Sequence, residues 1–184
     1  MNTVQPIRDI DKVLDIADYL RATSERNYVM FMIGIYSGLR ISDIRKLKVR
    51  DIKGKDYIYI REMKTEKEKR FIINDELKPI INNYIIGKQD YEYLLKSPKT
   101  NESITRQQAY NILSDAAKQF GLDSIGTHTL RKTWGYHTYQ QTHDAVAIMD
   151  ILNHSDISIT LRYIGINQDN KDKVMKKLSF KKKR

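Results

Sequence analysis

The segment from Glu25 to Ser37 is the feature that most restricts the fold, because apolar residues lie on nearly all sides of the helix that it predicts. Such a helix must be buried. Gly38 follows at once and is the usual residue for a left-handed helix cap. The chain then turns through a corner that contains Arg40, and Ser42 can cap a third helix over 42–47.

Arg40 is the first candidate for a binding residue. The backbone amides at a helix N-terminus favour an anion, and the corner after the buried helix delivers an arginine to that position. A surface arginine in an ordinary turn explains the corner equally well when it is considered alone.

The remaining elements can be assigned from periodicity and from turn residues. We expect helices at about 10–20, 75–86, 105–120 and 171–180, strands at 57–60 and 71–73, a short strand at 93–95, a polar loop over 96–106 and a linker over 165–170. The two longer strands are joined by a charged segment and predict a β-hairpin. The fold class is therefore α+β and mainly α-helical, with a small antiparallel β-hairpin or three-stranded sheet at one edge.

The stretch from Thr127 to Gly165 contains all four histidines of the chain in a mostly helical run. His128 and Arg131 are three residues apart, so a helix places both on one face, where an imidazole and a guanidinium can bind one anion. A turn then brings in His154, and the next short helix carries Tyr163. For any one of these residues an ordinary polar role is the better interpretation, but the spacing of the set favours a site.

The charge of the chain agrees with an anionic partner. Its 33 Lys and Arg against 23 Asp and Glu give a net charge of +10, which favours a polyanion such as nucleic acid, although a generally basic protein is about equally consistent. There is no cysteine and no apolar run long enough to span a membrane, and we see no secretory signal. We expect one folded domain in the cytoplasm, with no membrane association.

These residue types together suit phosphodiester chemistry. Two arginines can hold phosphate oxygens and neutralise a pentacoordinate transition state in place of a metal ion. A phenol such as that of Tyr163 has a reference pKa of about 10 and needs a proton acceptor, for which His128 is best placed. His154 can hydrogen-bond a non-bridging oxygen.

The leaving hydroxyl needs an acid, and Lys64 at the hairpin tip can supply it. Lys67 and Lys69 are rivals, because the register of the tip is uncertain from sequence. A charge run of this kind is usually only a solvated loop.

At this point the sequence resembles the tyrosine recombinase (phage integrase) family over essentially the whole chain. Any one motif is weak, but five occur in the right order. They are Gly38-Leu39-Arg40-Ile41-Ser42-Asp43, with Asp43 as a supporting acid; Lys64 on the hairpin; His128-Thr129-Leu130-Arg131; Leu152-Asn153-His154; and Tyr163 as the nucleophile. Lys132 follows Arg131 where many relatives carry histidine, a departure that we expect to matter little.

The resemblance implies the catalytic-domain fold of that family and an enzyme that cuts and rejoins double-stranded DNA through a 3′-phosphotyrosyl intermediate, without metal, cofactor or nucleotide. It also implies a homotetramer on synapsed DNA and a monomer when free. Residues 1–166 would form the catalytic domain, and 167–184 a linker, short helix and basic tail that docks onto a neighbour. The family's N-terminal core-binding domain is not expected, since about nine residues precede the first helix.

Three other functions remain open from sequence. A catalytically silent DNA-binding regulator with the same fold would not need a nucleophile. A type IB topoisomerase-like enzyme shares the chemistry but relaxes DNA without exchanging partners. A metal-dependent nuclease is disfavoured because no clustered carboxylates accompany the histidines.

Overall fold

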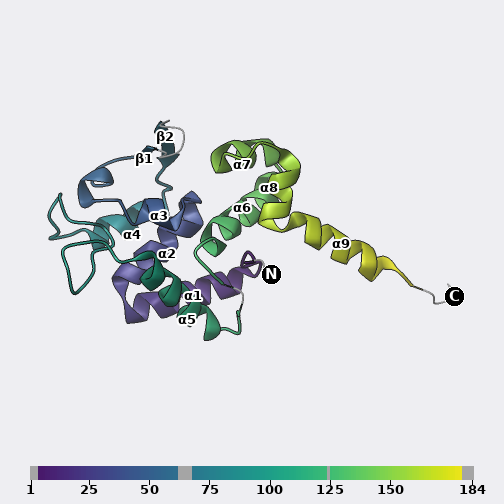
Figure 1. The fold of residues 1–184 in the computed structure, drawn as a ribbon, viewed down its shortest axis with the longest axis horizontal. Helices are drawn as coiled ribbons and strands as arrows, with labels where there is room; N and C mark the ends of the chain where they lie inside the picture. Colours follow the sequence, from purple (N-terminus) through teal and green to yellow (C-terminus); the bar gives the residue numbers. More distant parts are fainter. Residues whose placement is uncertain (1–3, 62–67, 124, 180–184) are drawn as a thin grey trace.

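The computed structural model describes residues 4–61, 68–123 and 125–179. Figure 1 shows helices packed into one body, with a small hairpin at one edge and the last helix projecting from that body. In chain order the elements are α1 (Ile10–Thr23), α2 (Glu25–Ser37), α3 (Ile41–Ile44), a short 3-10 helix (Val49–Asp51), β1 (Tyr57–Arg61), β2 (Glu68–Ile72), α4 (Leu77–Tyr84), α5 (Arg106–Lys118), α6 (Thr129–Thr142), α7 (Ala145–Leu152), α8 (Ile157–Ile164) and α9 (Ile166–Lys177).

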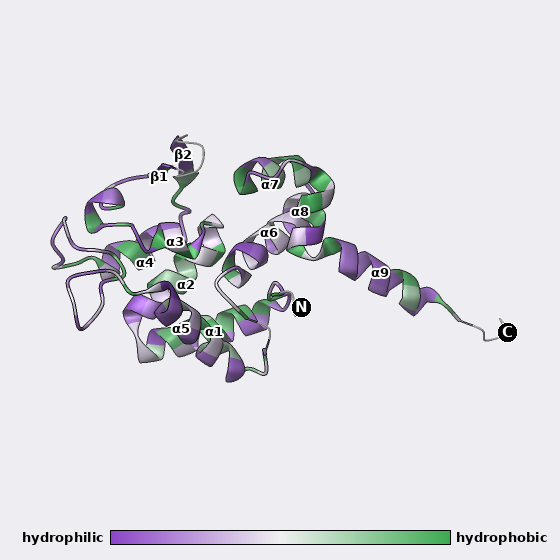
Figure 2. Ribbon diagram, viewed as in Figure 1, coloured by the Kyte–Doolittle hydropathy of each residue, from purple (hydrophilic) through white to green (hydrophobic). Residues whose placement is uncertain are grey.

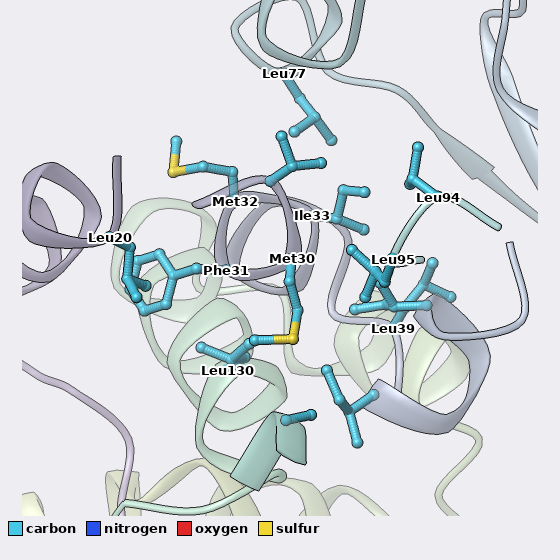
Figure 3. Packing of buried hydrophobic residues seen from close by; sticks show 14 of the residues in the cluster. Leu20, Met30, Phe31, Met32, Ile33, Leu39, Leu77, Leu94, Leu95 and Leu130 are labelled. Atoms are coloured by element: carbon cyan, nitrogen blue, oxygen red, sulfur yellow. The ribbon is translucent and has the colours of Figure 1, made fainter. Parts of the chain in front are cut away.

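Helix α2 forms the centre of the main hydrophobic core, as its apolar composition predicts. Its residues from Val29 to Gly34 are buried in succession, so side chains on every side of the helix meet neighbours. Figure 3 shows Met30, Phe31 and Ile33 packed among leucines from other parts of the chain. The predicted bounds of this helix are confirmed.

A second, smaller core joins α6, α7, α8 and α9. It contains Ile148, Leu152, Ile164 and Ile166, against which Trp134 and Tyr163 pack partly buried. Gly135 of α6 lies at its tightest point, because a Cβ atom there would be 2.7 Å from Cγ2 of Ile164. The glycine therefore lets α8 approach the backbone of α6 closely.

The sheet has two strands among the described residues, and the expected third strand is wrong. β1 and β2 pair antiparallel, with Tyr57 opposite Ile72. Tyr93 forms only an isolated bridge with Lys48. Leu94 and Leu95 are apolar because their side chains enter the main core, not because they lie in a strand.

Two helix boundaries also differ from the prediction. α3 ends at Ile44, and its N-cap is Arg40 instead of Ser42, because the amides of Asp43 and Ile44 donate to the Arg40 carbonyl at 2.8 and 3.0 Å. The expected linker over 165–170 does not exist, since α9 begins at Ile166.

α9 begins early because long-range contacts hold its first turns. Ile166 is buried in the second core, and Asp169 accepts a 2.8 Å ion pair from Arg8 near the other end of the chain. The rest of α9 extends away from the body in Figure 1, and its hydrophilic faces are interrupted by apolar residues in Figure 2. In the described ranges, no helix is both long enough and apolar enough to cross a membrane.

Candidate active site

The corner after α2 is pinned against α6 at Gly38. Its backbone has φ +63°, and a Cβ atom there would lie 2.5 Å from the ring of Trp134. Glycine meets both demands, because it has no side chain to strain the backbone or to strike the indole. The contact holds the corner against α6, and the charge of Arg40, two residues later, acts on His128 at the N-cap of that helix.

Arg131 joins three separate segments from a buried position. Its side chain is in a residue only 4% exposed, and it donates to the carbonyl oxygens of Gly38 at 2.6 Å and Leu152 at 2.9 Å. It also hydrogen-bonds the hydroxyl of Tyr163. One guanidinium therefore ties the corner, the end of α7 and the phenol of α8 together.

Tyr163 lies inside this arrangement, facing His154. The two rings meet edge to face, with centroids 5.0 Å apart and planes at 75°. Burial raises the pKa of Tyr163, and the positive charges of Arg131 and Arg40 oppose that shift. The phenol is consequently protonated at neutral pH and must lose a proton before it can attack.

His154 is oriented by its own loop and by α8. Asn153 ends α7 in the left-handed conformation, and the amide of His154 donates to the Met149 carbonyl at 3.0 Å. Nδ1 of the ring lies 3.0 Å from Oγ1 of the buried Thr160. Partial burial, with the charges of Arg131 and Arg40, lowers the pKa of His154.

His128 occupies the N-cap position of α6, with its side chain still open to solvent. Its pKa is lowered by partial desolvation and then by four positive charges, those of Arg106, Arg131, Lys132 and Arg40. A neutral imidazole at pH 7 can accept a proton, which is what a general base needs.

The other two predicted site residues are less well defined. Lys64 lies outside the described residues, so its role stays a prediction. Its rival Lys69 is described on β2, and its Nζ donates to the Asp150 carbonyl of α7 at 3.2 Å, which brings the hairpin to the site's side of the molecule. Asp43 lies in α3, where its carboxylate accepts from the Ser42 hydroxyl at 3.5 Å and forms no ion pair among the described residues.

Sequence reasoning missed three residues. Thr160 is three positions before Tyr163 on α8, so helical spacing could have indicated it. Arg106 starts α5 and acts on His128 from a distant part of the chain, for which no local signal exists. Lys132, which we expected from sequence to matter little, lies over the ring of Tyr163, with Nζ 4.8 Å from the centroid.

A mainly helical domain with a small hairpin, in which two arginines act on two histidines and on a tyrosine near the C-terminus, is the pattern of the catalytic domain of the tyrosine recombinases. Comparison with known proteins assigns the family: residues 7–170 match the model of the phage integrase family, and the chain belongs to it. The predicted family, fold and enzyme class are confirmed.

Individual relatives agree with this assignment. The chain is 48% identical over 169 residues to the probable integrase/recombinase YoeC of Bacillus subtilis, covering 92% of this chain and 93% of that protein. The chain covers only 58% and 57% of two longer tyrosine recombinases.

Two solved structures show the same fold at low identity. XerA recombinase superposes with a TM-score of 0.75 at 19% identity, covering 97% of this chain and 66% of that one. XerH recombinase bound to its palindromic difH substrate gives 0.73 at 17%, covering 95% and 53%.

Proposed function

We propose that this chain is a site-specific DNA recombinase that breaks and rejoins strands through a covalent bond between Tyr163 and the DNA phosphate. The observation that carries the proposal is the hydrogen bond between Arg131 and the Tyr163 hydroxyl, in a site that also contains Arg40 and His154. A phenol held against permanent positive charge is suited to attack an anionic phosphodiester.

Each step assigns one role to a residue. Oη of Tyr163 attacks phosphorus while its proton passes to the neutral His128, and the bond from phosphorus to O5′ breaks. The 5′ oxygen leaves with a proton supplied by Lys64, which gives a 5′-hydroxyl and a 3′-phosphotyrosine. Rejoining reverses these transfers with the 5′-hydroxyl of a partner strand, so the energy of the broken bond is retained.

The two arginines and His154 bind the phosphate during both steps. Arg131 has five N–H groups, so its bonds to the Gly38 and Leu152 carbonyls do not exhaust its donors. His154 is held by Thr160 and can hydrogen-bond a non-bridging oxygen. The charge of the transition state is thereby neutralised by side chains, and we propose that the reaction requires no metal ion.

The proposed partner is double-stranded DNA, which the net charge of +10 favours. We propose a monomer in free solution and a homotetramer on two duplexes. α9 supports this assembly, because Val174, Met175 and Leu178 are 69%, 70% and 64% exposed on a helix that projects from the body. Residues 1–166 then act as the catalytic domain, and 167–184 as the segment that docks onto a neighbour.

The test uses nicked suicide duplexes with randomised sequence around the nick, from which the released fragment cannot religate. In the presence of a chelator, the wild-type protein should form a covalent adduct that mass spectrometry locates at Tyr163. Tyr163→Phe should form none, whereas the control Tyr139→Phe, in the same small core, should react normally.

Other outcomes favour the alternative functions. DNA binding without any adduct would refute the proposal in favour of a silent regulator. An adduct together with relaxation of supercoiled plasmid at no preferred site would favour a type IB topoisomerase-like activity. Adduct-free cleavage that the chelator abolishes would indicate a metal-dependent nuclease.

A further inference from the structure

Lys132 is a buried lysine with an unusual environment. It is 7% exposed, and its Nζ lies over the face of the Tyr163 ring, 4.8 Å from the centroid. Among the described residues, its ammonium group forms no ion pair with a carboxylate and no hydrogen bond. Burial accordingly lowers the pKa of Lys132, with no neighbouring acid to oppose the shift.

Such a position lowers folding stability, so we ask which function could explain a lysine there. No buried side-chain nitrogen or oxygen among the described residues lacks a hydrogen-bond partner, so the ammonium group of Lys132, which has none, keeps some contact with water. Its partial loss of hydration is still unfavourable, and an apolar side chain of similar length would avoid that cost. The residue next to it, Arg131, already provides a permanent charge to the site. The role of Lys132, the second cation on α6, is therefore sought in the group that it contacts, which is the ring of Tyr163.

The contact is sensitive to the protonation of the phenol. A cation over an aromatic face is attracted to the π electrons of the neutral ring. When the hydroxyl loses its proton, negative charge spreads into the ring and the attraction becomes one between opposite charges, which burial leaves poorly screened. The contact is thus stronger with the phenolate than with the phenol.

Among the described residues, four groups act on different parts of Tyr163. Arg131 bonds the hydroxyl, Arg40 adds charge from the corner before α3, and His154 meets the ring at its edge. Lys132 is the cation on the ring face. Its contribution is therefore distinct from that of the arginines, which also bind the phosphate.

We propose that Lys132 is a positioning residue that fixes the Tyr163 ring by its face and favours the phenolate form of the nucleophile. The proposal rests on the proposed function, because it takes Tyr163 to be the attacking group.

The first measurement is the titration of Tyr163, followed by NMR in protein whose tyrosines are labelled at Cζ, with Tyr163→Phe used to assign the signal. Because the pKa of Lys132 is lowered and that of Tyr163 is raised, the two groups titrate in overlapping pH ranges and the Tyr163 signal reports the pair. In Lys132→Met we expect the midpoint of the Tyr163 titration to rise, by up to about one pKa unit, the scale of a buried cation–π contact. Lys132→Arg keeps the charge and should restore much of the shift. The control Lys118→Met removes an exposed lysine of α5 and should leave the titration unchanged.

The second measurement is the rate of adduct formation as a function of pH. Below the pKa of Tyr163, Lys132→Met should react roughly tenfold more slowly, because one pKa unit changes the phenolate fraction by about tenfold. Its rising limb should move to higher pH while DNA affinity matches that of Lys118→Met. The melting temperature of Lys132→Met should equal or exceed that of the wild type, since the buried charge is gone.

A structural role would give the opposite pattern. If Lys132→Met lowers the melting temperature and leaves both the pKa of Tyr163 and the pH profile in place, the proposal is wrong. Lys132→Gln replaces Lys132→Met in both measurements if the latter does not fold. A wild-type protein that forms no adduct would refute the proposed function, whereas the NMR titration would still decide whether Lys132 acts on Tyr163.

Discussion

The close approach of Gly135 and Ile164 gives a direct test of how tightly Tyr163, the proposed nucleophile, is held. In Gly135→Ala, the new methyl group would lie 2.7 Å from Cγ2 of Ile164, far inside van der Waals contact. Ile164 is buried in the second core and adjoins Tyr163 on α8. Because its χ1 is restricted and its surroundings are packed, we expect α8 to move away from α6 and Tyr163 to move with it.

Two opposing effects set the change in folding stability of Gly135→Ala. Alanine favours the interior of α6 over glycine by about 1 kcal/mol. Overpacking of a tight core costs roughly 1–3 kcal/mol. The net loss of folding stability should be at most about 2 kcal/mol, which leaves the protein folded. Cleavage should suffer far more, because a displacement of about 1 Å in a reacting group can cost on the order of 100-fold in rate.

The assay compares urea unfolding with the single-turnover rate of adduct formation. Gly135→Ala should lose little stability and most of its cleavage rate. Ile164→Ala removes the obstructing methyl group, so the double variant Gly135→Ala/Ile164→Ala should cleave faster than Gly135→Ala despite its poorer core. Cleavage by Gly135→Ala at the wild-type rate would refute the view that α6 and α8 fix the nucleophile through this contact.

Three further predictions concern the residues around the nucleophile. Thr160→Val removes the hydroxyl group beside Nδ1 of His154 and should slow adduct formation about fivefold, the effect of one hydrogen bond, with DNA affinity unchanged in a binding titration. The pKa of His154 is lowered in the folded protein, so the unfolded chain binds a proton first and folding stability should fall as pH drops through about 6.5. His154→Gln should therefore show a smaller fall in melting temperature between about pH 7.5 and 5.5. Parallel curves for the two proteins would show that protonation of His154 is not the cause. Arg131→Lys cannot fork onto the Gly38 and Leu152 carbonyls, so it should lose about 2–4 kcal/mol in urea unfolding, and a loss below about 1 kcal/mol would show that these bonds are dispensable.

The central helix and its corner could be predicted because their signals are local. A segment that is apolar on all sides and ends at a glycine has one reasonable interpretation, and the bounds Glu25–Ser37 followed from it. The predictions of a third strand and of a linker before α9 were wrong, because the residues there are placed by distant contacts. Leu94 and Ile166 are placed by tertiary burial, and Asp169 by an ion pair to Arg8, 161 residues away.

The same distinction applies to the site. Arg40, His128, Arg131, His154 and Tyr163 could be chosen from motif order, and the structure brings them together. The action of Arg106 on His128 and the contact of Lys132 with the Tyr163 ring arise only when separate helices pack, so spacing in the sequence does not reveal them.

The positive charge of Arg131 is oriented by backbone carbonyl groups and not by carboxylates among the described residues. Arg131 is bonded to two carbonyl oxygens, which orient its charge without cancelling it, and Lys132 has no carboxylate partner among the described residues. Burial first, and then the charges of Arg131 and Arg40 among others, lower the pKa values of His128 and His154. A phosphodiester that enters the site supplies the missing negative charge, so it should raise both histidine pKa values as it binds. Binding of a phosphodiester is then expected to take up protons as pH falls toward the histidine pKa values. Before binding, the imidazoles stay neutral because of the positive charges beside them.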